Sequence, residues 1–253
     1  MSQSKGRTVV VTGGSRGIGA SIARAFHQAG DSVLVGSRTD TGLAKELGSG
    51  ARHQKCDVVR PQHLRDLMRD ALDWTGRLDV LINNAGSSDW MSLADIDENF
   101  WQRMIDVNLK GVLFACQAAV AQFKGGGSII NVSSLAGKRG SANNAAYCAA
   151  KFGVNGITQA LAKELGPRNI RVNAVCPVYV ETEGLMEALG SKHSPTLGKD
   201  TRQYLADFAK NQSALGRLPS GEDVARVCMF LASPEASAVT GQCLNVDCGV
   251  LPS

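Results

Sequence analysis

The chain has 253 residues, 43% of them hydrophobic and 20% charged, a length and balance that predict one globular α/β domain over residues 1–253 and exclude wholesale disorder. Its formal net charge of +4 comes from Lys and Arg residues scattered along the sequence, which argues against a nucleic-acid-binding protein. The seven cysteines form no C-x-x-C pair and no zinc-ligand spacing with the four histidines, so we expect reduced thiols and no metal site. No apolar run approaches a membrane span and Met1–Lys5 is short and polar, so we expect a cytoplasmic protein that does not enter a membrane.

Short apolar runs alternate with longer amphipathic stretches along the chain. The predicted strands are residues 7–12, 32–36, 52–56, 79–83, 128–133, 171–176 and 243–246. The predicted helices are residues 18–29, 61–74, 100–123, 145–165 and 221–232. This alternation, with near-continuous apolar strands, predicts a doubly wound (Rossmann) α/β fold: a seven-stranded parallel sheet with helices on both faces. Residues 183–215 are polar and rich in Gly, and we expect them to be partly helical and to form a mobile lid.

A glycine-rich turn, Thr12–Gly19, connects the first predicted strand to the first predicted helix. Glycines there permit positive φ and a close approach of the backbone to a pyrophosphate, while the helix N-terminus offers free N–H groups. A P-loop is excluded because G-x-x-x-x-G-K-S/T does not occur. The turn therefore predicts a dinucleotide site with contacts from Gly13, Ser15, Arg16, Gly17, Ile18 and Gly19.

The end of the second strand indicates which dinucleotide binds. An NAD site places an acidic residue near this point to hold the ribose 2′-hydroxyl, and that carboxylate would repel a 2′-phosphate. This chain has Ser37 and Arg38 instead, and Arg16 in the glycine turn could reach the same phosphate. We therefore expect NADP(H) as the cofactor.

Tyr147 and Lys151 have the i, i+4 spacing that places two side chains on one face of a helix. A free phenol has a pKa of about 10, too high for efficient proton exchange near neutral pH. A nearby ammonium group favours the phenolate, so we expect Lys151 to lower the pKa of Tyr147. Polar residues also follow two predicted strands, at Asn83–Gly86 and at Ser133–Ser134, and parallel sheets bind ligands at that edge.

Together these residues resemble the short-chain dehydrogenase/reductase family over essentially the whole chain, from Arg7 to Gly249. The elements that carry the resemblance appear in family order and spacing: the Thr12–Gly19 turn, Asn83–Gly86, Asn108, Ser134 thirteen residues before Tyr147, and Lys151. The resemblance implies a catalytic tetrad of Asn108, Ser134, Tyr147 and Lys151, and the family spacing selects Ser134 rather than Ser133.

The resemblance also implies a role for each member of the tetrad. Tyr147 would give a proton to a carbonyl oxygen as hydride arrives from C4 of the nicotinamide, and Ser134 would hydrogen-bond that oxygen. Lys151 would bind the nicotinamide ribose and acidify Tyr147. Asn108 would hold a water that connects Lys151 to solvent.

Further cofactor contacts follow from the same resemblance. Asp57 and Val58 would meet the adenine. Asn84, Ala85 and Gly86 would pack beside the adenosine ribose, although Asn83 and Asn84 could instead be purely structural. The remaining implied contacts, near the nicotinamide carboxamide, are Pro177, Val180 and Thr182.

Two positions depart from the family pattern. Val178 stands where the family usually has Gly, so the loop near the nicotinamide could run differently. Asp247-Cys248-Gly249 stands where the family commonly has Asp-Gly-Gly, so Cys248 replaces a glycine. We expect this change to have a small effect. We expect residues 87–90, 138–144 and 183–215 to line the substrate pocket.

The leading interpretation is an NADPH-dependent carbonyl reductase or alcohol dehydrogenase acting on a small-molecule ketone or secondary alcohol. One alternative is a 3-oxoacyl-carrier-protein reductase, which would use basic residues near the pocket mouth to hold an acidic carrier protein. Arg168 fits that role, but Gly125–Gly127 offers no second cation beyond the neighbouring Lys124. Another is a non-enzymatic NADP-binding sensor or scaffold, which would typically have lost a catalytic residue. A sugar epimerase would be longer, with a G-x-x-G-x-x-G turn. The family habit further implies a homotetramer.

Overall fold

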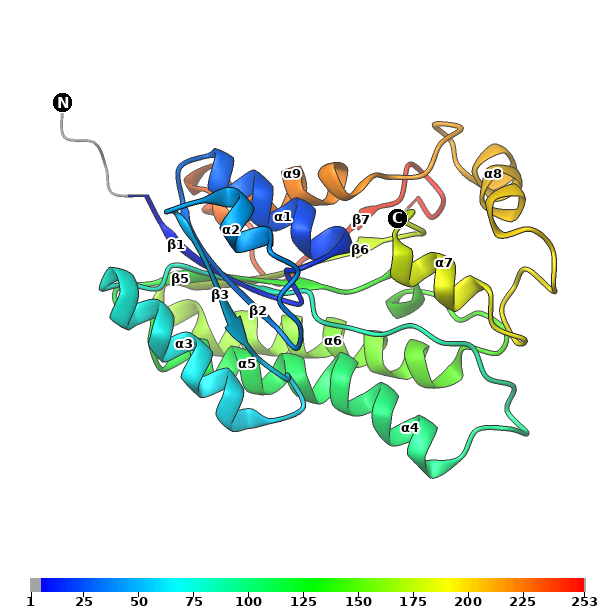
Figure 1. Ribbon diagram of the computed structural model, residues 1–253, viewed down its shortest axis with the longest axis horizontal. Helices are drawn as coiled ribbons and strands as arrows, with labels where there is room; N and C mark the ends of the chain where they lie inside the picture. Colours follow the sequence, from blue (N-terminus) through cyan, green and yellow to red (C-terminus); the bar gives the residue numbers. More distant parts are fainter. Residues whose placement is uncertain (1–5, 253) are drawn as a thin grey trace.

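A computed structural model of the protein describes residues 6–252 (Figure 1). Its core is one seven-stranded sheet with the order β3-β2-β1-β4-β5-β6-β7. All neighbouring strands are parallel, which confirms the predicted fold class. The strands are β1 (Thr8–Thr12), β2 (Ser32–Ser37), β3 (Ala51–Lys55), β4 (Val80–Asn83), β5 (Gly127–Val132), β6 (Ile170–Pro177) and β7 (Cys243–Val246).

Helices cover both faces of the sheet because alternate strand residues point to opposite sides. Val10 and Leu81 pack, on one face, against the apolar sides of α3 (Pro61–Thr75), α5 (Gly111–Val120) and α6 (Ala145–Leu165). Val9 and Ile82 pack, on the other face, against α1 (Gly17–Gln28) and α9 (Gly221–Ala232), as Figure 1 shows above the sheet. None of the helices in the described range is long and apolar enough to cross a membrane.

The register of the sheet brings polar strand ends together. Thr12 pairs with Asn83, and Asn83 pairs with Asn131, so β1, β4 and β5 end at the same edge. Asn83 Nδ2 donates to Asn131 Oδ1 at 2.9 Å, and Asn131 Nδ2 donates to Thr158 Oγ1 on α6 at 2.9 Å. This buried chain of hydrogen bonds fixes the ends of β4 and β5 against α6, and it shows a structural role for Asn83.

The helix predicted over residues 100–123 is interrupted. The structure has α4 (Glu98–Ile105), a π-helical turn over Asp106–Lys110, and then α5. In the π turn Asn108 is fully buried, and its Nδ2 donates to the Met104 carbonyl at 3.0 Å. Single π turns of this kind are often found at functional sites.

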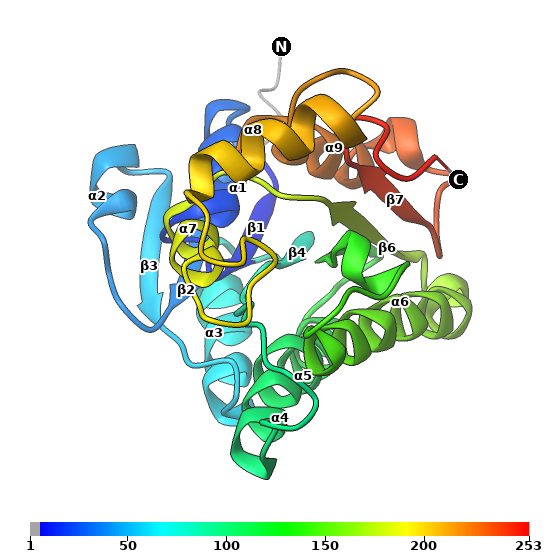
Figure 2. The same cartoon turned by 90° about the vertical axis from the view of Figure 1, so that its right-hand side faces the viewer.

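The predicted partly helical segment 183–215 contains α7 (Glu183–Leu189) and α8 (Thr201–Gln212). Both helices lie beyond the carboxyl ends of the strands, at the end of the molecule that faces the viewer in Figure 2. Leu189 and Leu205 are buried there against Trp90, which follows β4. A short helix, α2 (Leu43–Leu47), was not predicted, because five residues are too few to show a helical period.

The two departures from the family pattern behave differently in the structure. Val178 has no positive φ, so the loop after β6 adopts backbone angles that a β-branched residue accepts. Cys248 has φ of 54°, in the left-handed region that favours glycine. Its carbonyl accepts hydrogen bonds from Leu215 N at 3.1 Å and Ser213 Oγ at 3.0 Å, so the surrounding contacts hold this conformation in place.

We expect Cys248→Gly to stabilise the protein by about 1 kcal/mol, because glycine adopts this φ without the Cβ clash. In a protein of this size that corresponds to a rise in Tm of roughly 2–4 °C in a thermal melt. Cys248→Ala, which removes the thiol but keeps Cβ, is the control and should give no such gain. Equal effects of the two substitutions would contradict this explanation.

Candidate active site

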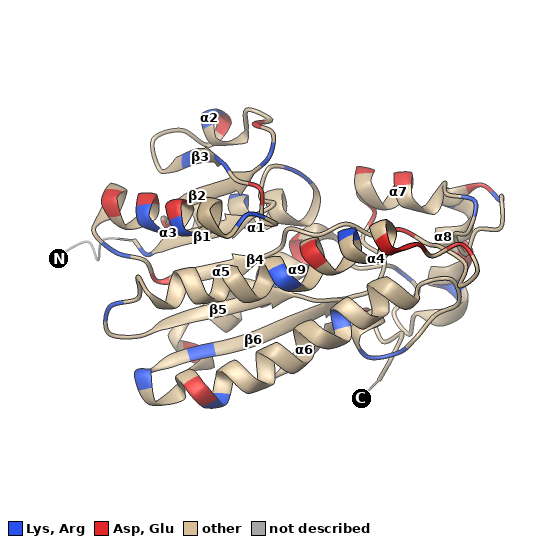
Figure 3. Cartoon of the chain, turned by 90° about the horizontal axis from the view of Figure 1, so that it is seen from below, with Lys and Arg blue, Asp and Glu red and all other residues tan. Residues whose placement is uncertain are grey.

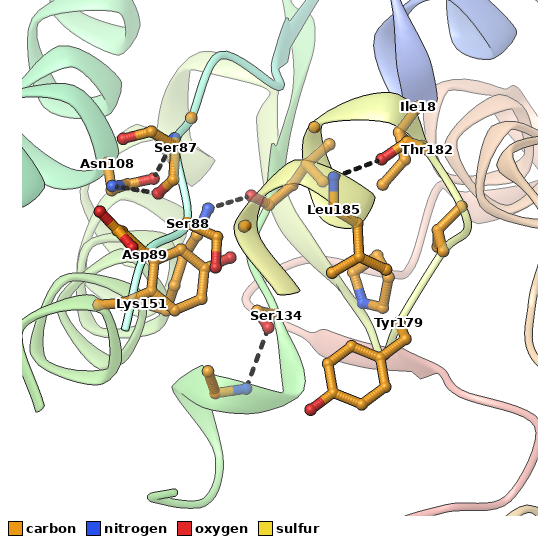
Figure 4. Close-up of a pocket in the computed structure, with 18 of the residues that line it drawn as sticks. Ile18, Ser87, Ser88, Asp89, Asn108, Ser134, Lys151, Tyr179, Thr182 and Leu185 are labelled. Carbon is orange, nitrogen blue, oxygen red and sulfur yellow. Dashed lines mark hydrogen bonds between the residues drawn. The ribbon is translucent and has the colours of Figure 1, made fainter. Parts of the chain in front are cut away.

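A cavity of about 640 Å³ opens at the carboxyl edge of the sheet. All four members of the predicted tetrad line it: Asn108, Ser134, Tyr147 and Lys151. So do eight of the other predicted cofactor contacts: Arg16, Ile18, Arg38, Asn84, Gly86, Pro177, Val180 and Thr182. Figure 4 shows Asn108, Ser134 and Lys151 around the same space as Ile18 and Thr182, so the fold brings widely separated segments to one place.

Lys151 is almost completely buried beneath the cavity. Its side chain is 4% exposed, and Nζ donates to the Val132 carbonyl at 2.9 Å. The same Nζ lies 5.6 Å from the centroid of the Tyr147 ring. Burial lowers the pKa of Lys151 to about 8, because the ammonium form loses hydration there. Lys151 therefore exchanges its proton close to neutral pH.

Tyr147 lies one helical turn before Lys151 and is half-buried. Burial raises the pKa of Tyr147 to about 12, while a hydrogen bond with the Ser134 side chain acts in the lowering direction. Lys151 does not contribute the lowering that we expected: its ammonium donates to the Val132 carbonyl, and Nζ lies 5.6 Å from the ring centroid. Tyr147 is thus a protonated phenol at neutral pH.

Ser134 directly follows β5 and starts a 3-10 turn over Leu135–Gly137. Its Oγ accepts from Ala136 N at 3.1 Å, the bond drawn in Figure 4, so the turn fixes the direction of the hydroxyl. The neighbouring Ser133 is 4% exposed, and its Oγ donates to the Lys151 carbonyl at 3.3 Å. The two hydroxyls therefore differ: Ser133 fastens the strand end to α6, and Ser134 faces the tyrosine.

Asn108 holds the loop that follows β4. Its Oδ1 accepts from Ser87 N at 3.1 Å, and its Nδ2 donates to the Ser87 carbonyl at 2.9 Å. Gly86 fits against it closely, since a Cβ at Gly86 would lie 2.9 Å from Asn108 Oδ1 and 3.8 Å from Lys151 Nζ. Asn108 thus shapes the cavity wall next to Lys151.

The glycine-rich turn has backbone angles and close contacts that leave no room for side chains at its glycines. Gly13 and Gly17 have φ of 64° and 55°, and a Cβ at Gly19 would lie 2.4 Å from both Asn84 Nδ2 and the Gly13 carbonyl. Asn84 Nδ2 donates to the Gly13 carbonyl at 3.0 Å and fixes the turn. The side chain of Arg16, the residue before α1, makes no hydrogen bond that caps the N-terminus of this helix. Its first N–H groups remain available for a phosphate, so this turn fits a dinucleotide.

Two arginines lie at this end of the cavity. Arg38 is exposed and makes no ion pair with any residue between 6 and 252, whereas Arg16 lies 3.8 Å from Glu183 Oε2. Ser37 is buried, and its hydroxyl donates to the Thr39 carbonyl at 2.8 Å and lies 2.9 Å from His53 Nε2. Arg38 is therefore the cation best placed to meet an anionic group of a ligand.

The chain matches known proteins over nearly its full length. The sequence model of a family described as enoyl-(acyl carrier protein) reductase matches residues 13–251. A putative ketoacyl reductase of the monensin polyketide synthase from Streptomyces virginiae is 37% identical and covers 99% of both chains. The 3-oxoacyl-(acyl-carrier-protein) reductase of Chlamydia pneumoniae is 36% identical over 97% of each. This chain belongs to the short-chain dehydrogenase/reductase family.

A solved structure agrees with this family assignment. A variant of the actinorhodin polyketide ketoreductase, solved with NADPH, superposes with a TM-score of 0.90 at 32% identity and covers 99% of both chains. This short-chain dehydrogenase/reductase is accordingly an oxidoreductase that acts on CH–OH groups, and its family binds NAD(P)H.

Some predicted contacts of this short-chain dehydrogenase/reductase do not line the cavity: Gly13, Ser15, Gly17, Gly19, Ser37, Asp57, Val58 and Ala85. Asp57 Oδ1 accepts from Val59 N at 3.3 Å, and Val58 packs against Gly111 at the start of α5. Their contacts to the adenine stay predictions.

Part of the expected substrate pocket lines the cavity. Residues 87–90 all do, together with parts of 138–144 and 183–215. Sequence reasoning missed Val132, Leu135 and Ala136, although their position at the end of a predicted strand could have indicated them.

Proposed function

We propose that this protein is an NADPH-dependent ketoreductase, which reduces a ketone to a secondary alcohol and catalyses the reverse oxidation. The observation that supports this most is the meeting of Tyr147, Ser134 and Lys151 around one cavity with Arg16 and Ile18 of the glycine-rich turn. A protonated phenol and a fixed hydroxyl are the groups that a developing alkoxide needs.

In this proposal the cofactor lies across the carboxyl ends of the strands. The N-terminus of α1 would hold the pyrophosphate, and Arg38 with Arg16 would hold the 2′-phosphate of NADP(H). Pro177, Val180 and Thr182 would contact the nicotinamide, and Lys151 would hold its ribose. When bound, NADPH supplies the hydride that reaches the carbonyl carbon.

The protein's own groups control the proton. Tyr147 donates its phenolic proton to the carbonyl oxygen, and Ser134 donates a hydrogen bond to the same oxygen. Because burial raises the pKa of Tyr147, its phenol is protonated at neutral pH, the form that donates a proton in reduction. Lys151 lies beside Tyr147, and Asn108 keeps the wall next to Lys151 in place.

The substrate half of the cavity has an apolar wall with a polar rim. Tyr179 and Phe208 pack edge to face with ring centroids 4.9 Å apart, and Val178 and Leu185 continue this wall. Segment 183–215 supplies part of it and would act as a lid. The wall supports a ketone with an apolar body of small or medium size.

A second candidate is the reduction of 3-oxoacyl thioesters on a carrier protein. It is favoured by the similarity to the ketoacyl reductase from Streptomyces virginiae and to the 3-oxoacyl-(acyl-carrier-protein) reductase of Chlamydia pneumoniae. We expect a 3-oxobutanoyl thioester of N-acetylcysteamine to be reduced, with loss of NADPH absorbance.

Arg168 is exposed on the surface, so Arg168→Glu should lower kcat/KM for the carrier-bound thioester by about tenfold if an acidic carrier docks there. The free thioester is the control and should be unaffected. Equal kcat/KM values of Arg168→Glu and the unsubstituted protein on the carrier-bound thioester would reject a docking site at Arg168, and no reduction of that thioester would reject the carrier-protein candidate.

We further propose a cytoplasmic homotetramer. Trp101 on α4 and Phe152 on α6 are 43% and 48% exposed, unusual values for such large apolar side chains. No charged residue lies on α5, which is tan throughout in Figure 3. These neighbouring helices offer an apolar surface to a second copy, and light scattering of the purified protein would test this.

A further inference from the structure

Asn155 lies on α6 one helical turn after Lys151 and links three elements of the site. Its side chain is 8% exposed. Nδ2 donates to the Gly137 carbonyl at 2.9 Å, and Oδ1 accepts a weak hydrogen bond from Cys176 Sγ at 3.9 Å. Gly137 ends the turn that starts at Ser134, and Cys176 lies near the end of β6. One amide thus joins α6 to the turn and to the strand.

The contact between the turn and α6 leaves no room for adjustment. A Cβ at Gly137 would lie 2.7 Å from the Lys151 carbonyl and 2.9 Å from Asn155 Nδ2. The turn therefore rests directly on the backbone of the helix that carries Tyr147 and Lys151. Because Ser134 Oγ is fixed within its own turn, the position of Gly137 on α6 sets the position of that hydroxyl relative to Tyr147.

We propose that Asn155 is a positioning residue, which holds the Ser134 hydroxyl beside Tyr147 through its hydrogen bond to the Gly137 carbonyl. This inference rests on the proposed function, since it assigns Asn155 to the same reaction. A purely structural role would affect only stability, whereas a positioning role also affects the reaction and the titration of Tyr147. The two roles therefore differ in measurable ways.

The test is Asn155→Leu, which keeps a similar volume but removes the donor to Gly137. We expect kcat to fall roughly 10- to 100-fold, because small displacements of reacting groups are costly. The Kd for NADPH should stay unchanged. In alcohol oxidation, the rising limb of the pH profile should move to higher pH, because the Ser134 hydrogen bond lowers the pKa of Tyr147 and would be weakened.

Asn173→Leu is the matched control. Asn173 is fully buried on β6 outside the cavity, where its Nδ2 donates to the Val239 carbonyl at 2.9 Å. The control should lose thermal stability while kcat and the pH limb stay unchanged. If Asn155→Leu behaves in the same way, Asn155 is only structural and the proposal is overturned.

Asn155→Asp provides a second variant of nearly the same shape, in case Asn155→Leu does not fold. A protonated carboxyl can donate to the Gly137 carbonyl and a carboxylate cannot, so its activity relative to the unsubstituted protein should rise as the pH falls. A constant ratio across the pH range would contradict the proposal. If instead Tyr147→Phe leaves activity intact, the proposed function itself is wrong, and this distinguishes the two failures.

Discussion

Tyr147→Phe should lower kcat for carbonyl reduction by at least about 100-fold and up to about 10,000-fold, the range that general acid catalysis contributes. The substitution removes only the phenolic oxygen, which carries a proton for donation and lies in the cavity with Ser134 and Lys151. The measurement is the steady-state loss of NADPH absorbance with a saturating ketone.

The phenylalanine variant should still bind NADPH, because the ring remains and the glycine turn and Arg38 are untouched. Fluorescence titration with NADPH and a thermal melt are the controls for folding. Ser134→Ala should give a smaller loss of kcat, since the hydroxyl stabilises the oxygen but does not supply the proton. A Tyr147→Phe variant with nearly full activity would show that another group supplies the proton.

Arg38→Asp should raise the Kd for NADPH by roughly 100-fold, while the Kd for NADH changes little. Arg38 makes no ion pair with any of the residues 6–252, so its guanidinium is available to a phosphate. The introduced carboxylate would repel the 2′-phosphate of NADPH and could accept a hydrogen bond from the 2′-hydroxyl of NADH.

Arg69→Asp is the matched control for a general effect of charge. Arg69 lies on α3 outside the cavity and pairs with Asp66 at 2.9 Å, so its reversal should leave both dissociation constants unchanged. Equal losses of NADPH and NADH affinity in Arg38→Asp would refute the assignment of the 2′-phosphate site.

The fold was predictable because its signals are local. Most strands are short apolar runs, although β3 is polar, and the long helices are amphipathic, so α6, α9 and β7 have the bounds that the sequence predicts. The π turn at Asp106–Lys110 was not predictable in this way. One inserted residue barely changes an apolar pattern, and the turn depends on contacts of Asn108 with Ser87 and Met104.

The members of the site could be predicted, but their environments could not. The pKa of Tyr147 is raised by burial, which arises only once distant segments of the chain pack together. Ser37 was expected at the phosphate, yet its hydroxyl contacts His53 on the neighbouring strand β3. Asn155 looked like an ordinary helix residue because its partner, Gly137, is 18 positions earlier in the chain. Such pairings depend on how the strands and helices cross, which no local pattern reveals.

The most direct test of the account follows one labelled atom. The protein is incubated with NADPH carrying deuterium at both C4 positions and with a ketone that it consumes from a panel including 3-oxoacyl thioesters. The product is analysed by mass spectrometry and NMR. We expect one deuterium on the carbinol carbon of a single secondary alcohol, formed rapidly by the unsubstituted protein and at least about 100-fold more slowly by Tyr147→Phe. An NADPH-binding protein that transfers no deuterium to any carbonyl in the panel, or transfers it equally well without the phenol, would contradict the account.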